Sequence, residues 1–274
     1  MSDNSRIEWT DATWNPIGGC SRVSPGCENC YAEREAIRTS GVGRRHQGLV
    51  RSTERGPRWT NVVRLFEDRL DQPLRWRRSR RVFVNSMSDL FHPDVADQWI
   101  ERIWTVMGRS PQHTFQILTK RPDRMRRFVE ANLGCTLPNV WLGVSVEDQE
   151  RADERVPLLL QTPAAVRFLS AEPLLGPVLF ASQTNSYLRP LWGGAGIDWV
   201  IVGGESGRGA RPLELAWIRS IRDQCAAAGV ACFVKQLGQR WSCSALFEGC
   251  MARTAKGADP QHWPADLRVR EFPR

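Results

Sequence analysis

The chain has 274 residues, of which 41% are hydrophobic and 25% are charged, the composition of an ordinary globular protein. No run approaches the roughly 20 apolar residues of a membrane-spanning helix, and the polar N-terminus lacks the apolar segment of a signal peptide, so we expect a cytoplasmic protein with no membrane partner. The formal net charge of +8 comes almost entirely from arginine, which makes nucleic acid, DNA or RNA, the first partner to consider; GC-rich codons are the alternative explanation.

The first predicted unit contains a strand over Asn15–Cys20 that runs into a cysteine-bearing loop. Residues 39–80 follow, and this stretch is so rich in arginine that it reads as a basic insertion after that unit. Trp59 and Trp76 lie within it and are candidates for stacking on nucleic-acid bases. Most of the other tryptophans are expected to fill the core.

Strands and helices then alternate along the chain. Short apolar runs predict buried strands over Arg81–Ser86, Thr114–Thr119, Val140–Ser145, Val166–Ser170, Trp199–Gly203 and Val230–Lys235. Apolar residues at helical spacing predict helices over Pro93–Met107, Asp123–Ala131, Glu147–Leu160 and Ala216–Ala228.

This alternation favours an α/β fold with a parallel sheet and right-handed crossovers. With about seven strands, we expect one domain over residues 1–274, a TIM-like parallel β/α barrel, partial or complete, with an irregular C-terminal tail over 239–274 that wraps it. A doubly wound open sheet is the alternative.

Each predicted strand delivers polar groups to its C-terminal end, where barrel enzymes carry their active sites. Simple solvation of strand ends would also place polar residues there. The candidates are Ser86, Asp89, Lys120, Arg121, Glu147, Glu172, Gly203, Gly204, Glu205 and Lys235. Among these, Glu147, Glu172 and Lys235 are the candidate catalytic residues; the two glutamates could instead be helix N-terminal charges.

Three cysteines, Cys20, Cys27 and Cys30, lie on one short loop rich in glycine and proline. In a reducing compartment their thiols are available as metal ligands. A structural zinc ion requires four ligands. The nearest other residue that could serve as a fourth ligand is His46. Three thiolates would suit a [4Fe–4S] cluster with one iron left open. A zinc site and no metal at all are the alternatives.

Several segments together resemble a known family: IEWTDATWNP, GCSRVSPGCENCYAE, FVNSMSDLFHPDV, LTKRPDRM, VWLGVSVEDQ, FLSAEPLLGPV, IVGGESG and FVKQLG. They are similar to the bacteriophage and prophage three-cysteine-motif family of unknown function. Through the cysteine loop they also resemble the radical S-adenosylmethionine superfamily.

The resemblance implies that Cys20, Cys27 and Cys30 bind three irons of the cluster and that S-adenosylmethionine binds the fourth. Among the other cofactor-binding candidates, Asp89 or Glu205 would hold its methionine amine, and Lys120 or Arg121 its carboxylate. The backbone of Gly203 and Gly204 would approach the ligand closely, and Tyr31 and Ser86 complete the set. A flavodoxin or ferredoxin would supply the electron.

Two departures from the superfamily pattern stand out. The gap after Cys20 is six residues where three are usual, and Asn29 occupies the aromatic position, with Tyr31 just after. The Gly-Gly-Glu element that usually follows the second strand is found here at Gly203–Glu205, after the sixth predicted strand.

Three functions are therefore open. The first is a radical-type enzyme that modifies or repairs nucleic acid. The second is a non-enzymatic iron–sulfur protein that binds nucleic acid through a structural or redox-sensing cluster. The third is a radical enzyme acting on a small metabolite or a protein. A second metal site at Cys225, Cys232, Cys243 and Cys250 is also conceivable, although Cys225 and Cys232 fit core positions.

Overall fold

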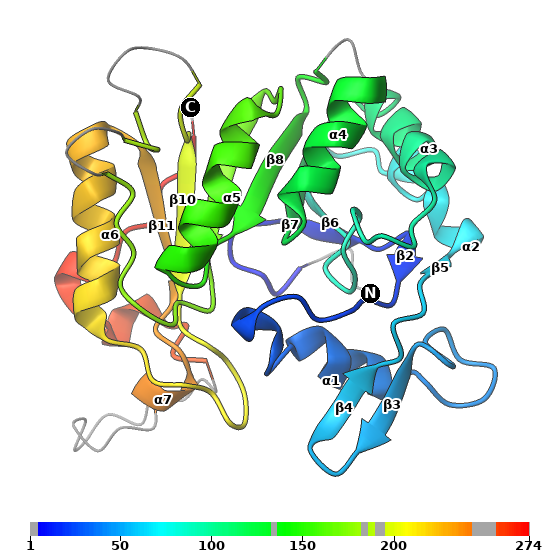
Figure 1. Cartoon of the computed structure of the whole chain (residues 1–274), viewed down its shortest axis with the longest axis horizontal. Coiled ribbons are helices and arrows are strands. Elements are labelled where there is room, and N and C mark those ends of the chain that lie inside the picture. The colour runs from blue at the N-terminus through cyan, green and yellow to red at the C-terminus, as the bar shows by residue number, and fades with distance from the viewer. Residues whose placement is uncertain (1–4, 133–135, 182–185, 190–194, 243–255, 274) are drawn as a thin grey trace. The chain divides into compact units, whose positions relative to one another are not determined.

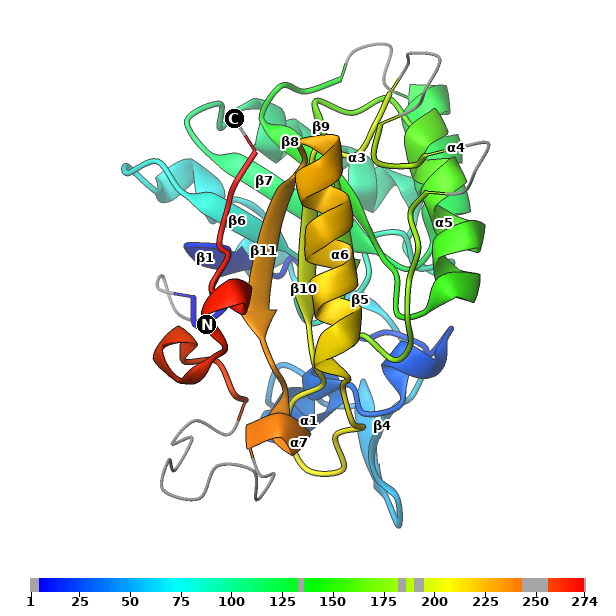
Figure 2. The same cartoon turned by 90° about the vertical axis from the view of Figure 1, so that its left-hand side faces the viewer.

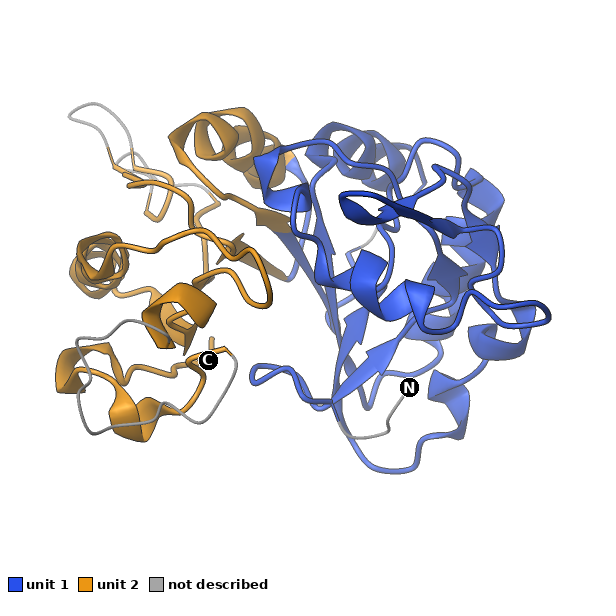
Figure 3. Ribbon diagram, turned by 90° about the horizontal axis from the view of Figure 1, so that it is seen from below, with its two compact units in different colours: residues 1–143, 162–165 blue, residues 144–161, 166–274 orange. Residues whose placement is uncertain are grey.

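The computed structural model describes residues 5–132, 136–181, 186–189, 195–242 and 256–273. The chain divides into two compact units, coloured separately in Figure 3. The first unit comprises residues 1–143 and 162–165, and the second comprises residues 144–161 and 166–274. Among the described helices, none combines the length and the apolar character needed to cross a membrane.

The first unit is built on parallel strands with helices between them. Its strands are β1 (Ala12–Trp14), β6 (Arg81–Val84), β7 (Thr114–Thr119) and the first part of β8 (Val140–Ser145), and its larger helices are α3 (Asp97–Gly108) and α4 (Pro122–Asn132). β1 pairs with β6, and β6 with β7, both in parallel. Trp14 packs on Phe115 of β7, and Trp104 of α3 packs on Phe128 of α4, so aromatic side chains form much of the core.

Smaller elements lie between β1 and β6. They are β2 (Ile17–Gly18), the 3-10 turn η1 (Pro25–Cys27), α1 (Tyr31–Ile37), β3 (Val50–Thr53), β4 (Gly56–Trp59), β5 (Arg64–Leu65), α2 (Glu67–Leu70) and the turn η2 (Pro73–Arg75). β3 and β4 form an antiparallel hairpin that contacts α1 (Figure 1). The arginine-rich stretch 39–80 thus folds as a hairpin and short turns packed on the cysteine-bearing segment.

The second unit contains the end of β8, then α5 (Gln149–Gln161), β9 (Val166–Ala171), β10 (Trp199–Gly203), α6 (Leu215–Ala228), β11 (Ala231–Gln236) and α7 (Gln239–Ser242), with the turns η3 (Pro260–His262) and η4 (Ala265–Leu267). Trp199 of β10 packs between Phe168 and Phe233 on the neighbouring strands. Figure 2 shows α6 beside β10 and β11, with the last residues running along β11. There the Val234 amide donates to the Val269 carbonyl and the Glu271 amide to the Cys232 carbonyl, both at 2.9 Å, so the C-terminal segment covers the outer edge of β11.

The seven long strands are hydrogen-bonded in the order β1-β6-β7-β8-β9-β10-β11. Each strand of this parallel sheet is therefore next to its successor in the chain, apart from the small elements between β1 and β6. A doubly wound sheet reverses its order at a switch point, and this order contains no reversal. The predicted α/β fold and its parallel sheet are confirmed, and the doubly wound alternative is wrong.

The predicted first strand is wrong in position. The strand that joins the sheet is Ala12–Trp14, and the chain leaves the sheet at Asn15–Pro16. Proline has no amide hydrogen for a ladder, and the Pro16 carbonyl accepts instead from the Phe66 amide at 2.7 Å. Ile17–Gly18 then pairs antiparallel with Arg64–Leu65.

Candidate three-cysteine site

The three cysteines lie on the loop between β2 and α1, in the first unit. Cys20 follows β2, Cys27 ends the turn η1, and Cys30 directly precedes α1. All three cysteines are reduced and half-buried as residues. Cys20 and Cys30 also border a small apolar cluster formed mainly by α1 and the β3–β4 hairpin. The loop therefore presents three thiols while its two ends are packed against the rest of the unit.

The entry to the loop requires glycine at two successive positions. A Cβ atom on Gly18 would lie 2.5 Å from the Phe66 ring, and one on Gly19 would lie 2.0 Å from the Val62 carbonyl oxygen. Gly19 also has a φ of +89°, which side chains with a Cβ rarely adopt. These contacts fix the position of Cys20 against the segment that leads into β5.

The exit from the loop is held by Glu33, a buried carboxylate on α1 with 1% of its surface exposed. Arg22 of the loop donates to it through Nη2 at 2.6 Å, and the Trp59 amide of β4 donates at 3.0 Å. Arg58 stands 3.6 Å away. One carboxylate thus connects the cysteine loop, α1 and the hairpin. Glu33 is not among the residues predicted from the sequence, where its only signal is its position three residues after Cys30.

Burial dominates the electrostatics of the thiols. It raises the pKa of Cys20 to about 12, with a further contribution from Asp89 and an opposing one from Arg121. Burial also raises the pKa of Cys30, against the lowering effect of the Glu33 and Ala32 amides. Each of these pKa values is raised further by the charge of Cys27, so the three sulfurs share one electrostatic environment. Without a metal the Cys20 thiol is protonated at neutral pH, and a metal that binds it must displace that proton.

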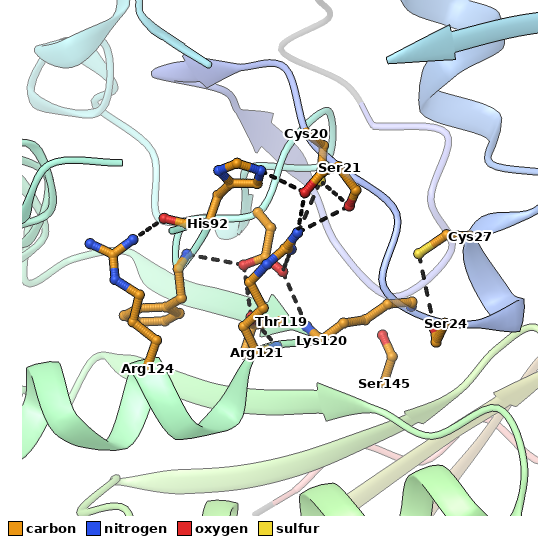
Figure 4. A network of polar contacts seen from close by, with 12 residues as sticks. Cys20, Ser21, Ser24, Cys27, His92, Thr119, Lys120, Arg121, Arg124 and Ser145 are labelled. Atoms are coloured by element: carbon orange, nitrogen blue, oxygen red, sulfur yellow. Dashed lines mark hydrogen bonds and ion pairs between the residues drawn. The ribbon is translucent and has the colours of Figure 1, made fainter. Parts of the chain in front are cut away.

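Arg121, directly before α4, places a guanidinium group against the cysteine loop (Figure 4). Its Nη1 lies 4.0 Å from the Cys20 sulfur, and its Nη2 donates to the Ser21 carbonyl at 3.0 Å and to the Ser21 hydroxyl at 2.9 Å. The same hydroxyl lies 2.7 Å from Nε2 of His92. The Asp94 amide donates to Nδ1 of His92 at 3.2 Å, so in the neutral ring Nε2 carries the hydrogen and donates to Ser21.

Asp89 holds Arg121 in this position. Its Oδ2 accepts from Arg121 Nη1 at 2.8 Å and from the Lys120 amide at 3.2 Å. Its Oδ1 accepts from the Thr119 hydroxyl at 2.7 Å and the Phe91 amide at 3.0 Å. Four donors satisfy both oxygens of this buried carboxylate. Asp89 and Arg121 were predicted to bind the amine and the carboxylate of a cofactor, but here they bind each other and the cysteine loop.

Tyr31 and Ser86, the other cofactor-binding candidates of this unit, also contact one another. The Tyr31 hydroxyl donates to the Ser86 carbonyl at 2.5 Å, and the Ser86 hydroxyl donates to the Asn15 side chain at 3.1 Å. The first residue of α1 is thereby joined to the C-terminal end of β6. The structure therefore brings together in the first unit Cys20, Cys27, Cys30, Tyr31, Ser86, Asp89, Lys120 and Arg121.

The remaining predicted site residues belong to the second unit, where they form two ion pairs. Glu147 is fully buried and pairs with Arg155 at 3.0 Å, a geometry that gives the carboxylate a structural partner. Glu172 and Lys235 pair through Nζ at 2.6 and 2.8 Å from the two carboxylate oxygens. The predicted catalytic residues thus include one linked pair, Glu172 with Lys235.

Gly203, Gly204 and Glu205 follow β10 in the same unit. A Cβ atom on Gly204 would lie 2.7 Å from the Leu237 carbonyl oxygen, so the close backbone approach expected there is made to the chain itself. Glu205 accepts from the Arg211 amide at 2.8 Å and from its Nε at 3.0 Å. The element thus serves in packing the loops that follow β10 and β11.

The other cysteines were candidates for a second metal site or for the core, and the two tryptophans of the basic stretch were candidates for base stacking. Cys225 and Cys232 are buried, and their mutual hydrogen bond, together with burial, raises the pKa of Cys225; both fit the expected core role. Cys243 and Cys250 lie outside the described residues. Trp59 and Trp76 are buried in the core of the first unit, so neither is placed to stack on a base, because its ring already packs against protein.

The donor set can be tested against a metal. In the described part of the chain, no three cysteine, histidine or acidic side chains stand close enough together to hold one metal ion. Tetrahedral zinc, with Zn–S bonds of about 2.3 Å, needs sulfurs within about 3.8 Å of one another. In a [4Fe–4S] cluster each thiolate binds a different iron, and three soft, reduced thiols on one loop match that chemistry.

The fold and the site define the class: a parallel α/β protein with a loop of three reduced cysteines beside a buried arginine–aspartate pair. By sequence the chain belongs to a family described as protein of unknown function (DUF5131), whose model matches residues 4–265. The match covers nearly the whole chain. The search of curated proteins and the search of solved structures each found no match.

Proposed function

We propose that the first unit binds a [4Fe–4S] cluster through Cys20, Cys27 and Cys30, and that the protein is a radical S-adenosylmethionine-type enzyme acting on nucleic acid. One observation carries the proposal. Three reduced cysteines lie on one loop that is fixed at both ends by Gly18–Gly19 and Glu33, and the charge of Cys27 raises the pKa of both Cys20 and Cys30.

The strand order of the parallel sheet supports the resemblance to the radical S-adenosylmethionine superfamily on which this proposal draws. A single parallel sheet whose strands follow chain order is what a partial TIM-like barrel requires. In such folds function gathers at the C-terminal ends of the strands, and the cysteine loop follows β1 and β2 at that end of the first unit.

When bound, a cluster with one iron free of protein sulfur supplies an electron for the reductive cleavage of S-adenosylmethionine. The residues of this chain would then have three tasks. The cysteines bind iron, Arg121 offsets negative charge beside Cys20, and Asp89 holds Arg121. Because Asp89 is fully engaged, Lys120 is left as the candidate of this unit for binding the cofactor itself.

Nucleic acid is the proposed substrate because positive charge gathers in the unit that carries the cysteines. A radical step on a base requires the base to be flipped out or single-stranded. The alternative function, a non-enzymatic iron–sulfur protein that binds nucleic acid, shares the cluster and the charge and lacks only the cleavage of S-adenosylmethionine.

Anaerobic reconstitution with iron and sulfide tests the proposal. We expect a brown protein with about four irons per chain and an EPR signal after reduction that changes when S-adenosylmethionine is added. Cys20→Ala, Cys27→Ala and Cys30→Ala should each lose iron, whereas the matched control Cys225→Ala should keep it.

The outcomes separate the alternatives. A colourless protein that binds only zinc, or full iron content in the three loop variants, would overturn the cluster. An EPR signal indifferent to S-adenosylmethionine would leave the non-enzymatic iron–sulfur protein. Cleavage of S-adenosylmethionine without any affinity for nucleic acid would point to a metabolite or protein substrate.

A further inference from the structure

The positive charge of this protein is concentrated in one segment. Residues 39–80 contain eleven arginines and four acidic residues, Glu54, Glu67, Asp68 and Asp71, a net charge of +7 out of +8 for the whole chain. The rest of the chain is therefore close to neutral. The excess of arginine is therefore a property of residues 39–80 and not of the chain as a whole.

Only some of these arginines have a structural partner. Arg45 pairs with Asp68 at 2.8 Å, and Arg58 lies 3.6 Å from Glu33. Within the described residues, no ion pair or side-chain hydrogen bond is made by six of them, all exposed: Arg44, Arg51, Arg55, Arg75, Arg77 and Arg78. Arginines that stabilised the fold would be expected to have partners, as Arg45 does.

The β3–β4 hairpin places two of the arginines in direct opposition. Its register sets Arg51 across from Arg58, on the face opposite the Val50–Trp59 pair. Like charges directly opposite in an antiparallel pair destabilise a hairpin. Glu33 offsets part of the charge of Arg58, but Arg51 has no such neighbour. An anionic partner that bridges the pair would remove the repulsion.

The same hairpin is rigidly joined to the cysteine-bearing segment. Val50 and Trp59 are buried in a cluster with Ala32 and Ala36 of α1, and Glu33 accepts from the Trp59 amide. The arginine face is thus fixed on the helix that begins directly after Cys30. A partner bound there would lie on the unit that carries the three thiols.

We propose that this hairpin face, formed by Arg51 and Arg58, binds the phosphate backbone of nucleic acid together with Arg55 in the hairpin turn and Arg44 in the segment that precedes β3. The planar guanidinium fork matches phosphate oxygens, and successive phosphates offer several anions to one rigid face. The inference rests on the proposed function in that it names the surface through which the nucleic-acid substrate would be held. It does not require the cluster to be present.

The test compares two triple variants that remove the same charge. In the first, Arg44, Arg51 and Arg55 are changed to glutamine (R44Q/R51Q/R55Q). In the matched control, the other three unpaired arginines are changed (R75Q/R77Q/R78Q). Binding of fluorescein-labelled single-stranded DNA, duplex DNA and RNA of one sequence is measured by anisotropy over a range of salt concentrations. Thermal unfolding and iron per chain are measured on the same samples.

We expect the hairpin variant to bind at least about tenfold more weakly, and the control to bind like the wild type. The slope of log K against log salt should decrease in magnitude by about 2 for single strands and nearly 3 for duplex. Equal losses in both variants would overturn the inference, since net charge alone would then explain binding. So would equal competition by polyglutamate, because the surface would then select any polyanion.

The readouts keep the two proposals apart. Binding with the expected loss in a protein that contains no iron would support this surface while the iron–sulfur function fails. Full iron content with no nucleic-acid binding in the wild type would support the cluster and overturn the proposed arginine surface.

Discussion

At the scale of single residues, the arrangement that matters most is the contact between Arg121 and Cys20. Asp89 has four donors and no capacity left for a ligand, so its role is to hold the guanidinium. Arg121 in turn opposes the rise in the pKa of Cys20 that burial and Asp89 produce. The pair acts on the first thiol as a positioned counter-charge.

Changing Arg121 to glutamine should therefore weaken iron binding. The R121Q protein would keep the negative charge of Asp89 beside Cys20 and lose the positive charge that offsets it, which disfavours the thiolate. Outer-shell partners of metal ligands typically change affinity by about 10- to 100-fold, and we expect the lower end of that range. The measurement is the rate of iron loss to a chelator under anaerobic conditions.

The control for this change is R126Q on α4, the helix that begins directly after Arg121; it removes one arginine that pairs with Glu130. It should lose iron at the wild-type rate. If R121Q and R126Q lose iron equally slowly, Arg121 has no influence on the site.

The glycine at position 19 allows a second prediction. Gly19→Ala must accommodate both a φ of +89° and a Cβ atom 2.0 Å from the Val62 carbonyl oxygen. Gly43→Ala is the matched control, with a φ of +70° and no atom within 4 Å of the new Cβ. The left-handed conformation alone costs about 1–2 kcal/mol.

We expect G43A to be destabilised by about that amount and G19A by about 3 kcal/mol or more. The free energy of unfolding is measured by urea titration. Similar values for the two variants would show that β2 moves away from Val62 without cost.

At the scale of elements, the cysteine loop, α1 and the β3–β4 hairpin behave as one assembly because Glu33 touches all three. Changing Glu33 to glutamine keeps its volume and removes its charge, which leaves Arg22 and Arg58 facing a neutral group. Breaking a buried pair costs about 3–5 kcal/mol, but 31% of the Arg22 side chain is exposed, so we expect about 2 kcal/mol after allowing for solvent screening.

Two readouts test this coupling. The free energy of unfolding should fall for E33Q and stay within about 0.5 kcal/mol of wild type for E35Q, whose surface pair with Arg38 lies on the same helix. Hydrogen exchange should speed up in E33Q both in the loop 20–30 and in the hairpin 50–59. Faster exchange in only one of them would mean that Glu33 does not connect the two.

The elements also show what could be read from the sequence. The strands β7, β8 and β10 were predicted with their observed bounds, and β9 and β11 within one residue, because strands buried on both faces are continuously apolar. β1 was misplaced because its apolar signal, Ala12 and Trp14, spans three residues only. The β3–β4 hairpin was missed because β3 has one buried residue beside three exposed polar ones, and β4 begins with Gly56 and Pro57, which are rare inside strands.

Some residues of the three-cysteine site could be predicted from the sequence and others could not. The cysteines were found because spacing along a loop is a property of the sequence itself. The pairing of Asp89 with Arg121 joins residues 32 positions apart, and no local pattern reveals that both carboxylate oxygens are already satisfied. Glu33 is equally hidden from the sequence, because its burial and its contacts with Arg22 and Trp59 arise only in the fold.

At the scale of the whole molecule, the two units differ in what they carry. The first has the three-cysteine loop and the basic hairpin, and the second has the Glu172–Lys235 and Glu147–Arg155 ion pairs. The histidines differ too: His46, His92 and His113 are buried in the first unit, and His262 is a partly exposed residue of the second. This distribution makes the stability of the first unit the more sensitive to pH.

Burial is the leading cause that lowers the pKa of His46, His92 and His113 below the ordinary value of 6.5. As the pH falls past 6.5, these histidines are protonated in the unfolded chain but stay neutral in the folded chain, so unfolding is favoured. The loss of stability begins near pH 6.5 and continues until the pH passes the lowered folded values, with each unit of pKa difference worth about 1.4 kcal/mol.

The thiols act at the other end of the pH range. The raised pKa values of Cys20 and Cys30 mean that the unfolded chain loses protons first as the pH rises past about 9. Stability of the metal-free first unit should therefore be greatest between about pH 7 and 8.5 and fall on both sides. Urea titrations at a series of pH values, followed by tryptophan fluorescence, measure this profile.

The pH profile has an acid limb, the fall in stability below about pH 7, and an alkaline limb, the fall above about pH 8.5. Histidine substitution should change only the first, and metal loading only the second. The variant H46Q/H113Q should show a shallower acid limb even where its absolute stability is lower, whereas H262Q should leave the limb unchanged. Loading the cysteines with a metal should reduce the alkaline limb to the part that Cys225 contributes, because thiolates bound to metal have no proton left to lose. An alkaline limb that is the same with and without metal would mean that Cys20 and Cys30 are not its ligands, and an acid limb unaffected by H46Q/H113Q would place the acid sensitivity outside these two side chains.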